Sequence, residues 1–328
     1  MADTLHIQPG QRLSRRTRVS TTLILFGVLV VMVAVFSALS RDFYSFLNIS
    51  TMLTNISFSG IVAGTLTLIM ITGGLDISFG GNIALTSCLV AWLFNLKPPV
   101  PGWALIPIAL ALGAAIGSFN GFFITRLELN PIITTLGTMA VTRGVGYVIT
   151  KARSILIMEP VTGFLGRTVI PGIKIPIPLA LFAVIFAILF FVLSRSKFGR
   201  KIYCIGANQA AAKVSGIRVN RVKFILYLMG GIAASLSGLI LAGQTAVGMP
   251  QHARGMELDV ITAVLLGGTA LAGGKGSILG TLAGVLILGV LYNGFTMIGF
   301  RYVQISVFQG VLLILIVALY ELRDRKRY

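Results

Sequence analysis

The segment GTALAGGKGS, residues 268–277, has the glycines and the lysine of a loop that binds phosphate. Such a loop needs a glycine five residues before the glycine of its Gly-Lys pair, and Thr269 stands at that position. It also needs Ser or Thr after the lysine to reach Mg²⁺, and Gly276 stands there instead. The segment therefore predicts a tight turn, and this chain is not expected to hydrolyse ATP.

Other reactive groups are sparse. Cys88 and Cys204 are far apart and neither lies near a cluster of Cys or His, so we predict no metal site, no disulfide framework and no catalytic residue. Asp76 stands out because it ends an apolar run inside the glycine-rich stretch 73–80. A carboxylate at membrane depth is a candidate for function, whereas Asp is also a strong N-cap for a helix that begins near Ile77. Both interpretations stay open.

Long apolar runs are the elements that must position these residues. Of the 328 residues 56% are hydrophobic and 11% are charged, and the mean hydropathy is +0.93, which leaves too few charges to cover an ordinary soluble domain. Ten runs recur, at 21–39, 53–72, 80–96, 103–124, 131–150, 178–194, 222–246, 258–272, 277–298 and 303–320. Most are long enough to cross a bilayer, and the eighth is short enough to be a half-helix or a re-entrant segment. We predict an all-α polytopic membrane protein with about ten transmembrane helices in residues 21–320.

The charge of +18 would ordinarily raise the question of nucleic acid, but membrane topology accounts for it. With the amino terminus in the cytoplasm and ten crossings, most basic residues fall on the inner side, as the positive-inside rule expects. The basic tails 1–20 and 321–328 are then both cytoplasmic, and no nucleic-acid partner is predicted. The first run is longer than the core of a secretory signal, which favours a retained anchor.

A basic loop at 195–221 is the most distinctive segment on the predicted cytoplasmic side. Asn208 is a good N-cap for a short helix over 209–215, and Gly216 suits the position just after its end. The loop could contact anionic lipid head groups or present a protruding surface to another protein. The sequence leaves both roles open.

Small residues recur at helical spacing in three of the runs, at Gly60 and Gly64, at Gly113, Gly117 and Gly121, and at Gly280 and Gly284. Such stripes let two helix backbones approach closely in lipid. Packing within one subunit is the favoured use, with a dimer face as the alternative.

Four groups of short motifs occur in order along the chain: GGLDISFG at 73–80; NG at 120–121 with NPIITTLG at 130–137 and RG at 143–144; FGR at 198–200 through SGI at 215–217; and ELD at 257–259 with GGT at 267–269 and GG at 273–274. Together they resemble the membrane permeases of ABC importers for monosaccharides of the ribose, xylose and arabinose type, which are related to the autoinducer-2 importer permeases. The resemblance covers roughly residues 40–320.

This resemblance implies that the chain works in the bacterial inner membrane with several partners. They are a cytoplasmic ATPase with two nucleotide-binding domains, which would hold the ATP and Mg, a periplasmic sugar-binding protein, and a second permease copy or a paralogue. It implies that the ATPase docks at Gly199, Arg200, Asn208, Ala211, Ala212, Lys213 and Gly216. Other ABC importers carry a Glu-Ala-Ala-x-x-x-Gly pattern there, and Ala210 replaces the Glu, so we expect docking to depend on helix shape and nearby basic residues.

Polar residues inside the apolar runs are the candidates for a translocation path, because the hydroxyls of a dehydrated neutral sugar need hydrogen-bond partners. The candidates are Asp76, Asn82, Asn120, Thr134, Thr135 and Asn293. Interhelical hydrogen bonding is the alternative role for such residues. Candidates for contact with the binding protein on the outer side are Arg153, Arg167, Arg254 and Glu257.

Three dipeptides hint at an inverted repeat: Leu75-Asp76, Asn120-Gly121 and Arg143-Gly144 are echoed by Leu258-Asp259, Asn293-Gly294 and Gln309-Gly310. The first series starts on the predicted inner side and the second on the outer side, as an inverted repeat requires. The main functional prediction is import of a small sugar by alternating access, driven by ATP on a partner. A self-sufficient ion-coupled transporter is the runner-up, and pentoses, hexoses, polyols and autoinducer-2 all remain as solutes.

Overall fold

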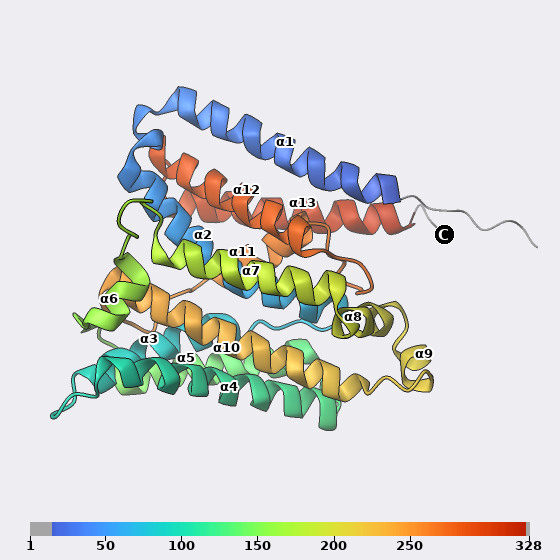
Figure 1. The fold of residues 1–328 in the computed structure, drawn as a ribbon, viewed down its shortest axis with the longest axis horizontal. Helices are drawn as coiled ribbons and strands as arrows, with labels where there is room; N and C mark the ends of the chain where they lie inside the picture. Colours follow the sequence, from blue (N-terminus) through green and yellow to red (C-terminus); the bar gives the residue numbers. More distant parts are fainter. Residues whose placement is uncertain (1–14, 326–328) are drawn as a thin grey trace, which may run out of the picture.

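A computed structural model describes residues 15–325 and is almost entirely helical (Figure 1). The predicted terminal tails therefore lie largely outside the described residues. The α-helices are α1 (Arg15–Leu39), α2 (Phe46–Ile71), α3 (Phe79–Phe94), α4 (Gly102–Arg126), α5 (Pro131–Thr150), α6 (Pro160–Arg167), α7 (Ile177–Arg195), α8 (Lys197–Ala207), α9 (Gln209–Val214), α10 (Val219–Thr245), α11 (Met256–Leu266), α12 (Ile278–Met297) and α13 (Tyr302–Arg325). A 3-10 helix η1 (Arg41–Tyr44) and two paired strands, β1 (Ile155–Leu156) and β2 (Val247–Gly248), complete the elements.

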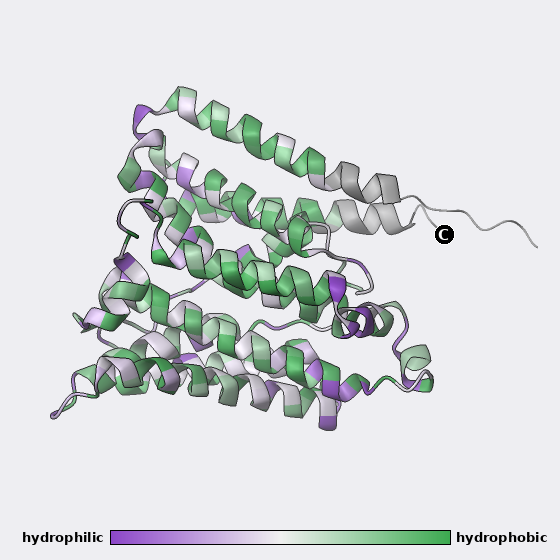
Figure 2. Ribbon diagram, in the orientation of Figure 1, coloured by the Kyte–Doolittle hydropathy of each residue, from purple (hydrophilic) through white to green (hydrophobic). Residues whose placement is uncertain are grey.

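The prediction of a polytopic helical membrane protein is confirmed. Seven helices in the described residues, namely α1, α2, α4, α5, α7, α10 and α12, are long and apolar enough to cross a membrane. Apolar residues cover these helices, while hydrophilic residues gather near the ends of the bundle and on α8 (Figure 2). The eighth apolar run forms the 11-residue α11, which rises about 16 Å and so covers only about half of a hydrocarbon core about 30 Å thick. It is a half-helix.

The long helices run side by side, and the short helices α6, α8 and α9 lie at the two ends of the bundle (Figure 1). We call these the α9 end, which carries α8 and α9, and the α6 end. Helix α1 begins and α13 ends at the α9 end (Figure 1). The described chain therefore enters and leaves the bundle on the same side.

The glycine stripes pack helices of one subunit against each other, as favoured from the sequence. A Cβ atom added to Gly113 of α4 would lie 2.4 Å from the carbonyl oxygen of Gly231 in α10, and one added to Gly117 would lie 2.4 Å from that of Tyr227. Gly60 of α2 faces the ring of Phe182 in α7 in the same way. These close approaches fix α10 and α2 in the centre of the bundle.

Two long helices are each followed by an irregular segment and a short helix. Residues 72–78 link α2 to α3, and residues 246–255, which we call the strap, link α10 to α11. Helix α4 packs on α10 while α12 packs on α2, and α5 packs on α3 while α13 packs on α11. Each of these contacts thus has an equivalent in the other half of the chain, as an inverted repeat would give. The repeat itself stays a prediction.

Candidate functional site

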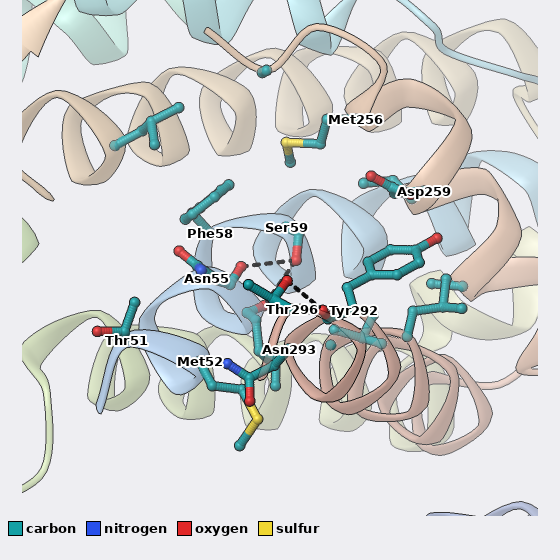
Figure 3. Close-up of a pocket in the computed structure, with 18 of the residues that line it drawn as sticks. Thr51, Met52, Asn55, Phe58, Ser59, Met256, Asp259, Tyr292, Asn293 and Thr296 are labelled. Atoms are coloured by element: carbon teal, nitrogen blue, oxygen red, sulfur yellow. Dashed lines mark hydrogen bonds between the residues drawn. The ribbon is translucent and has the colours of Figure 1, made fainter. Parts of the chain in front are cut away.

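A cavity of about 920 Å³ lies between α2, α11, α12 and the strap, and we call it the outer cavity (Figure 3). It follows α2 from Ser45 to Ala63, a rise of about 27 Å along the helix axis. Ser45 and Leu47 at one end are exposed, whereas Ala63 and Ala263 at the other are buried. Because α2 starts at the α6 end (Figure 1), the cavity opens toward that end and closes inside the bundle.

Polar residues of α2 form one wall of this cavity. Asn48, Thr51, Asn55 and Ser59, which we call the α2 stripe, are spaced by three or four residues and so share one face of the helix. Thr51, Asn55 and Ser59 lie opposite or beside Asn293 and Thr296 of α12 (Figure 3). All of these side chains are neutral amides or hydroxyls, which can both donate and accept hydrogen bonds.

Hydrogen bonds hold the amides of this wall in place. Asn48 Nδ2 donates to Asn293 Oδ1 at 3.0 Å, and Asn293 Nδ2 donates back to Asn48 Oδ1 at 2.7 Å. Asn55 Oδ1 accepts from Gln244 Nε2 at 2.9 Å, and Ser59 Oγ donates to the Asn55 carbonyl at 3.0 Å. The Asn55 amide nitrogen, the acceptor side of the Ser59 hydroxyl and the exposed hydroxyl of Thr51 are therefore groups able to bind a solute.

Three charged residues also line the cavity, and none of them belongs to the α2 stripe. Asp42 and Arg254 are exposed, in η1 and the strap respectively. Asp259 of α11 accepts a hydrogen bond from Gln309 of α13. The wall that α2 supplies is thus neutral, and Asp259 lies on the α11 side.

Of the six residues predicted for the translocation path, Asn293 lines the outer cavity. Asn82 is buried and donates to the Gly231 carbonyl at 2.9 Å, which joins α3 to α10. Asn120 is buried and donates to Ser78 Oγ at 2.8 Å, which joins α4 to the start of α3. These two amides make the interhelical hydrogen bonds that the sequence left as their alternative role.

The other three path candidates also lie away from the outer cavity. Asp76 is buried and its Oδ1 accepts from the backbone nitrogen of Ser78 at 2.8 Å, which orders the turn before α3 begins at Phe79, two residues later than expected. Thr135 is buried and donates to the Pro131 carbonyl of its own helix. Thr134 lines a separate groove between α4 and α5. A role in transport stays a prediction for all six.

Sequence reasoning missed Thr51, Asn55 and Ser59. The predicted run began at residue 53 and so left Thr51 out, whereas Asn55 and Ser59 lay inside the run and were not selected from it. The signal was nevertheless present, because polar residues at spacings of three and four in an apolar stretch mark one face of a helix.

The second candidate site is α8–α9, where the predicted capped helix is confirmed. Asn208 Oδ1 accepts from the backbone nitrogen of Ala211 at 3.0 Å, as an N-cap should. After the helix, Gly216 has a φ of +79°, and the backbone nitrogen of Ile217 donates to the Ala212 carbonyl at 3.0 Å. This is the Schellman arrangement that ends helices at glycine.

The predicted docking residues divide into exposed and buried ones. Gly199 and Ala212 are buried and serve packing. The exposed ones are Arg200, Asn208, Ala211, Lys213 and Gly216. Val214 was not predicted, yet it is 91% exposed and gives α9 an apolar tip beside Lys213.

Contacts between α8, the end of α2 and the turn before α12 join α8 to the core of the bundle. We call this set of contacts the inner clasp. Tyr203 Oη donates to the Gly276 carbonyl at 2.8 Å, and the backbone nitrogen of Gly274 donates to the Ile71 carbonyl at 2.8 Å. A Cβ atom added to Gly206 would lie 1.8 Å from that same Ile71 oxygen. The loop that resembled a phosphate-binding loop is therefore a tight turn between α11 and α12, as predicted, and it contacts α8 and the end of α2.

The residues predicted to contact a binding protein lie in two settings. Arg153, Arg167 and Arg254 are exposed on loops or on α6. Glu257 differs, because its Oε2 atom is buried without a hydrogen-bond partner and would lie 2.8 Å from a Cβ added to Gly80 of α3. The strap carries the chain into the bundle before α11 begins, which brings Glu257 to the start of α3.

Comparison with known proteins agrees with this architecture. The family described as branched-chain amino acid transport system permease component matches residues 48–318. The ribose import permease RbsC of Escherichia coli K12 is 36% identical over 307 residues, covering 91% of this chain and 92% of the relative. RbsC of Bacillus subtilis 168 is 38% identical, covering 91% of each chain, and the L-arabinose permease AraH of Escherichia coli K12 is 34% identical, covering 89% of this chain and 87% of the relative.

No solved structure is significantly similar to this chain. The family match covers most of the chain, and the resemblance read from the motifs is confirmed. The chain is a multi-pass protein of the bacterial inner membrane and belongs to the permease family of ABC importers, which work with an ATPase and a binding protein.

Proposed function

We propose that this permease imports a small neutral sugar, from the periplasm to the cytoplasm, by alternating access. The observation that carries the proposal is the α2 stripe, which lines the outer cavity together with Asn293. A sugar loses hydrogen bonds from water to each of its hydroxyls when it enters the protein, and neutral amides and hydroxyls replace them without a charge. The relatives RbsC and AraH are permeases for ribose and L-arabinose, and because both sugars are pentoses, this similarity supports a pentose.

A branched-chain amino acid is the solute named in the family description, and the cavity fits it less well. Its ammonium and carboxylate groups would need charged or strongly polarised partners close together. Arg254 and Asp42 are exposed, and Asp259 already holds Gln309. The neutral α2 stripe favours a polyhydroxy solute.

We infer that the α9 end faces the cytoplasm and the α6 end the periplasm. The basic residues around α8 and α9 support this orientation under the positive-inside rule. Both termini would then be cytoplasmic. An ATPase with two nucleotide-binding domains would dock on α8–α9 and hold the ATP and Mg, so that this chain needs no cofactor. The exposed Arg153, Arg167 and Arg254 would meet the sugar-binding protein, and a second permease copy or a paralogue would complete the channel.

Reconstitution tests the solute and the energy source together. The permease, its ATPase and its binding protein are placed in proteoliposomes, and uptake of ribose, L-arabinose and leucine is measured with and without ATP. We expect ATP-dependent uptake of a pentose. Uptake of leucine with no uptake of any sugar would contradict the sugar assignment, and ion-driven uptake by the permease alone would contradict the ATP-driven mechanism.

A matched pair of serine variants tests the cavity. Ser59 and Ser194 each donate to a carbonyl of their own helix, but only Ser59 of the two lines the outer cavity. Ser59→Ala removes one hydroxyl from the wall, worth about 1 kcal/mol, so KM for the sugar should rise about fivefold. Ser194→Ala should leave KM unchanged.

A further inference from the structure

The strap has a conformation that its own sequence does not favour. Ala246 and Ala253 have φ values of +57° and +54°, in the left-handed region that residues with a Cβ atom rarely adopt. Alanine has no polar side chain to stabilise that conformation locally. Two such residues within one ten-residue segment persist only where surrounding contacts hold them.

Arg143 of α5 supplies contacts of this kind. Its Nη1 atom donates to the carbonyl oxygen of Pro250 at 2.9 Å and lies 3.4 Å from that of His252. A guanidinium donates stronger hydrogen bonds than a neutral group, and here a single nitrogen of the group serves both carbonyl oxygens. Arg143 therefore ties the middle of the strap to a different helix, 107 residues away in sequence.

The rest of the strap is fixed on other sides. His252 Nδ1 lies 3.0 Å from Ser87 Oγ of α3, and β2 at the start of the strap pairs with β1. The side chain of Pro250 lies 3.6 Å from a Cβ added to Gly146, one turn after Arg143 on α5. Arg143 is the contact among these that carries a charge.

The strap also forms a wall of the outer cavity. Gln251, His252, Ala253 and Arg254 line it, whereas Arg143 does not. A change at Arg143 can therefore alter the shape of the cavity without removing any group that touches the solute.

The same guanidinium lies near the start of α11. A Cβ added to Gly80 would lie 2.8 Å from Glu257 Oε2 and 3.5 Å from Arg143 Nη2, so both charged groups lie beside Gly80. Among the described residues the buried Oε2 has no hydrogen-bond partner, and a buried carboxylate is unfavourable without a positive charge nearby. The guanidinium of Arg143 lies beside the same glycine and so is the positive group placed near it.

We propose that Arg143 is a positioning residue for transport: it holds the strap in its strained conformation as a wall of the outer cavity and thereby sets the affinity for the solute. The part of this proposal that concerns affinity rests on the proposed sugar import.

Hydrogen exchange on the purified full-length permease in lipid nanodiscs tests the structural part without any sugar. Arg143→Gln should speed exchange of strap amides at least tenfold and leave peptides from α10 and α12 unchanged, with a smaller effect for Arg143→Lys, which keeps the charge. Arg126→Gln is the control, because Arg126 is exposed at the end of α4. Unchanged strap exchange, or an equal increase throughout the protein, would overturn the proposal.

Uptake by the reconstituted complex tests the functional part. We expect KM for the sugar to rise about tenfold in Arg143→Gln, with Vmax per folded permease within twofold, and Arg143→Lys to recover part of the loss. A fall in Vmax at constant KM would overturn the positioning role. If Arg143→Gln does not fold, Arg143→Lys decides, and wild-type exchange and KM in that variant would refute the proposal. A wild-type complex that takes up no sugar refutes the proposed function, while the exchange experiment still decides the role of Arg143 in the strap.

Discussion

The N-cap of α9 makes a direct prediction about docking of the ATPase. Helix α9 has only six residues, and Ala212 is its buried residue, so its stability depends on the caps at its two ends. Asn208→Ala removes the bond to the Ala211 nitrogen, which typically costs about 1 kcal/mol and so lowers the equilibrium constant for forming the helix about fivefold. If the ATPase binds the formed helix, its Kd should rise by a factor of up to about five, in proportion to the loss of the formed population.

Asn208→Ser is the matched control, because serine caps helices about as well as asparagine but lacks the amide. The Kd of the ATPase for each purified permease variant is measured in detergent, and hydrogen exchange of residues 209–214 is followed in parallel. We expect weak binding and fast exchange for the alanine variant alone. Equally weak binding by the serine variant would show that the ATPase contacts the amide itself and would refute the capping argument. Wild-type binding by the alanine variant, despite faster exchange, would refute docking on α9.

The inner clasp and the strap give two further predictions. Gly206→Ala should lower the melting temperature, because its Cβ would lie 1.8 Å from the Ile71 oxygen and such overpacking costs about 1–3 kcal/mol. Gly137→Ala, with no atom within 4 Å of its added Cβ, should not lower it, and equal losses in both would contradict this reasoning. Burial lowers the pKa of His252 to about 4 from 6.5, because the charged ring loses its water. As the pH falls, His252 therefore binds a proton in the unfolded chain before it does so in the folded one. The free energy of unfolding should then fall by about 3 kcal/mol between about pH 6.5 and pH 4. Chemical unfolding at pH 7.5 and 4.5 should show this loss in the wild type but not in His252→Asn.

The sequence was sufficient to predict the bounds of a helix where residues at the helix ends determine them. Helix α5 spans Pro131–Thr150 as predicted, because Asn130 accepts from the backbone nitrogen of Ile132 and Pro131 starts the helix. Helix α11 stops at Leu266, six residues before the end of the eighth apolar run. Hydropathy counts side chains and takes no account of the backbone, which turns at Gly268 with a φ of +92°.

The candidate site was less accessible to sequence reasoning because it depends on contacts between distant segments. Asn293 was selected as a polar residue in an apolar run, but its partner Asn48 is 245 residues away. Arg143 was noticed as part of a family motif and of a possible repeat, since no local spacing relates it to Pro250. Glu257 was expected on the outer surface, because no pattern in the sequence indicates that the strap turns into the bundle.

The inner clasp has a thermodynamic consequence. Helix α8 contacts Ile71 at the end of α2 and the loop that leads into α12, and both of these helices line the outer cavity. A partner that shifts α8 then acts on the same helices that line the outer cavity. Linkage is reciprocal, so whatever factor the bound ATPase applies to the affinity for sugar, bound sugar must apply to the affinity for the ATPase. Two equilibrium titrations, one of the ATPase with and without sugar and one of sugar with and without the ATPase, should therefore give the same coupling free energy.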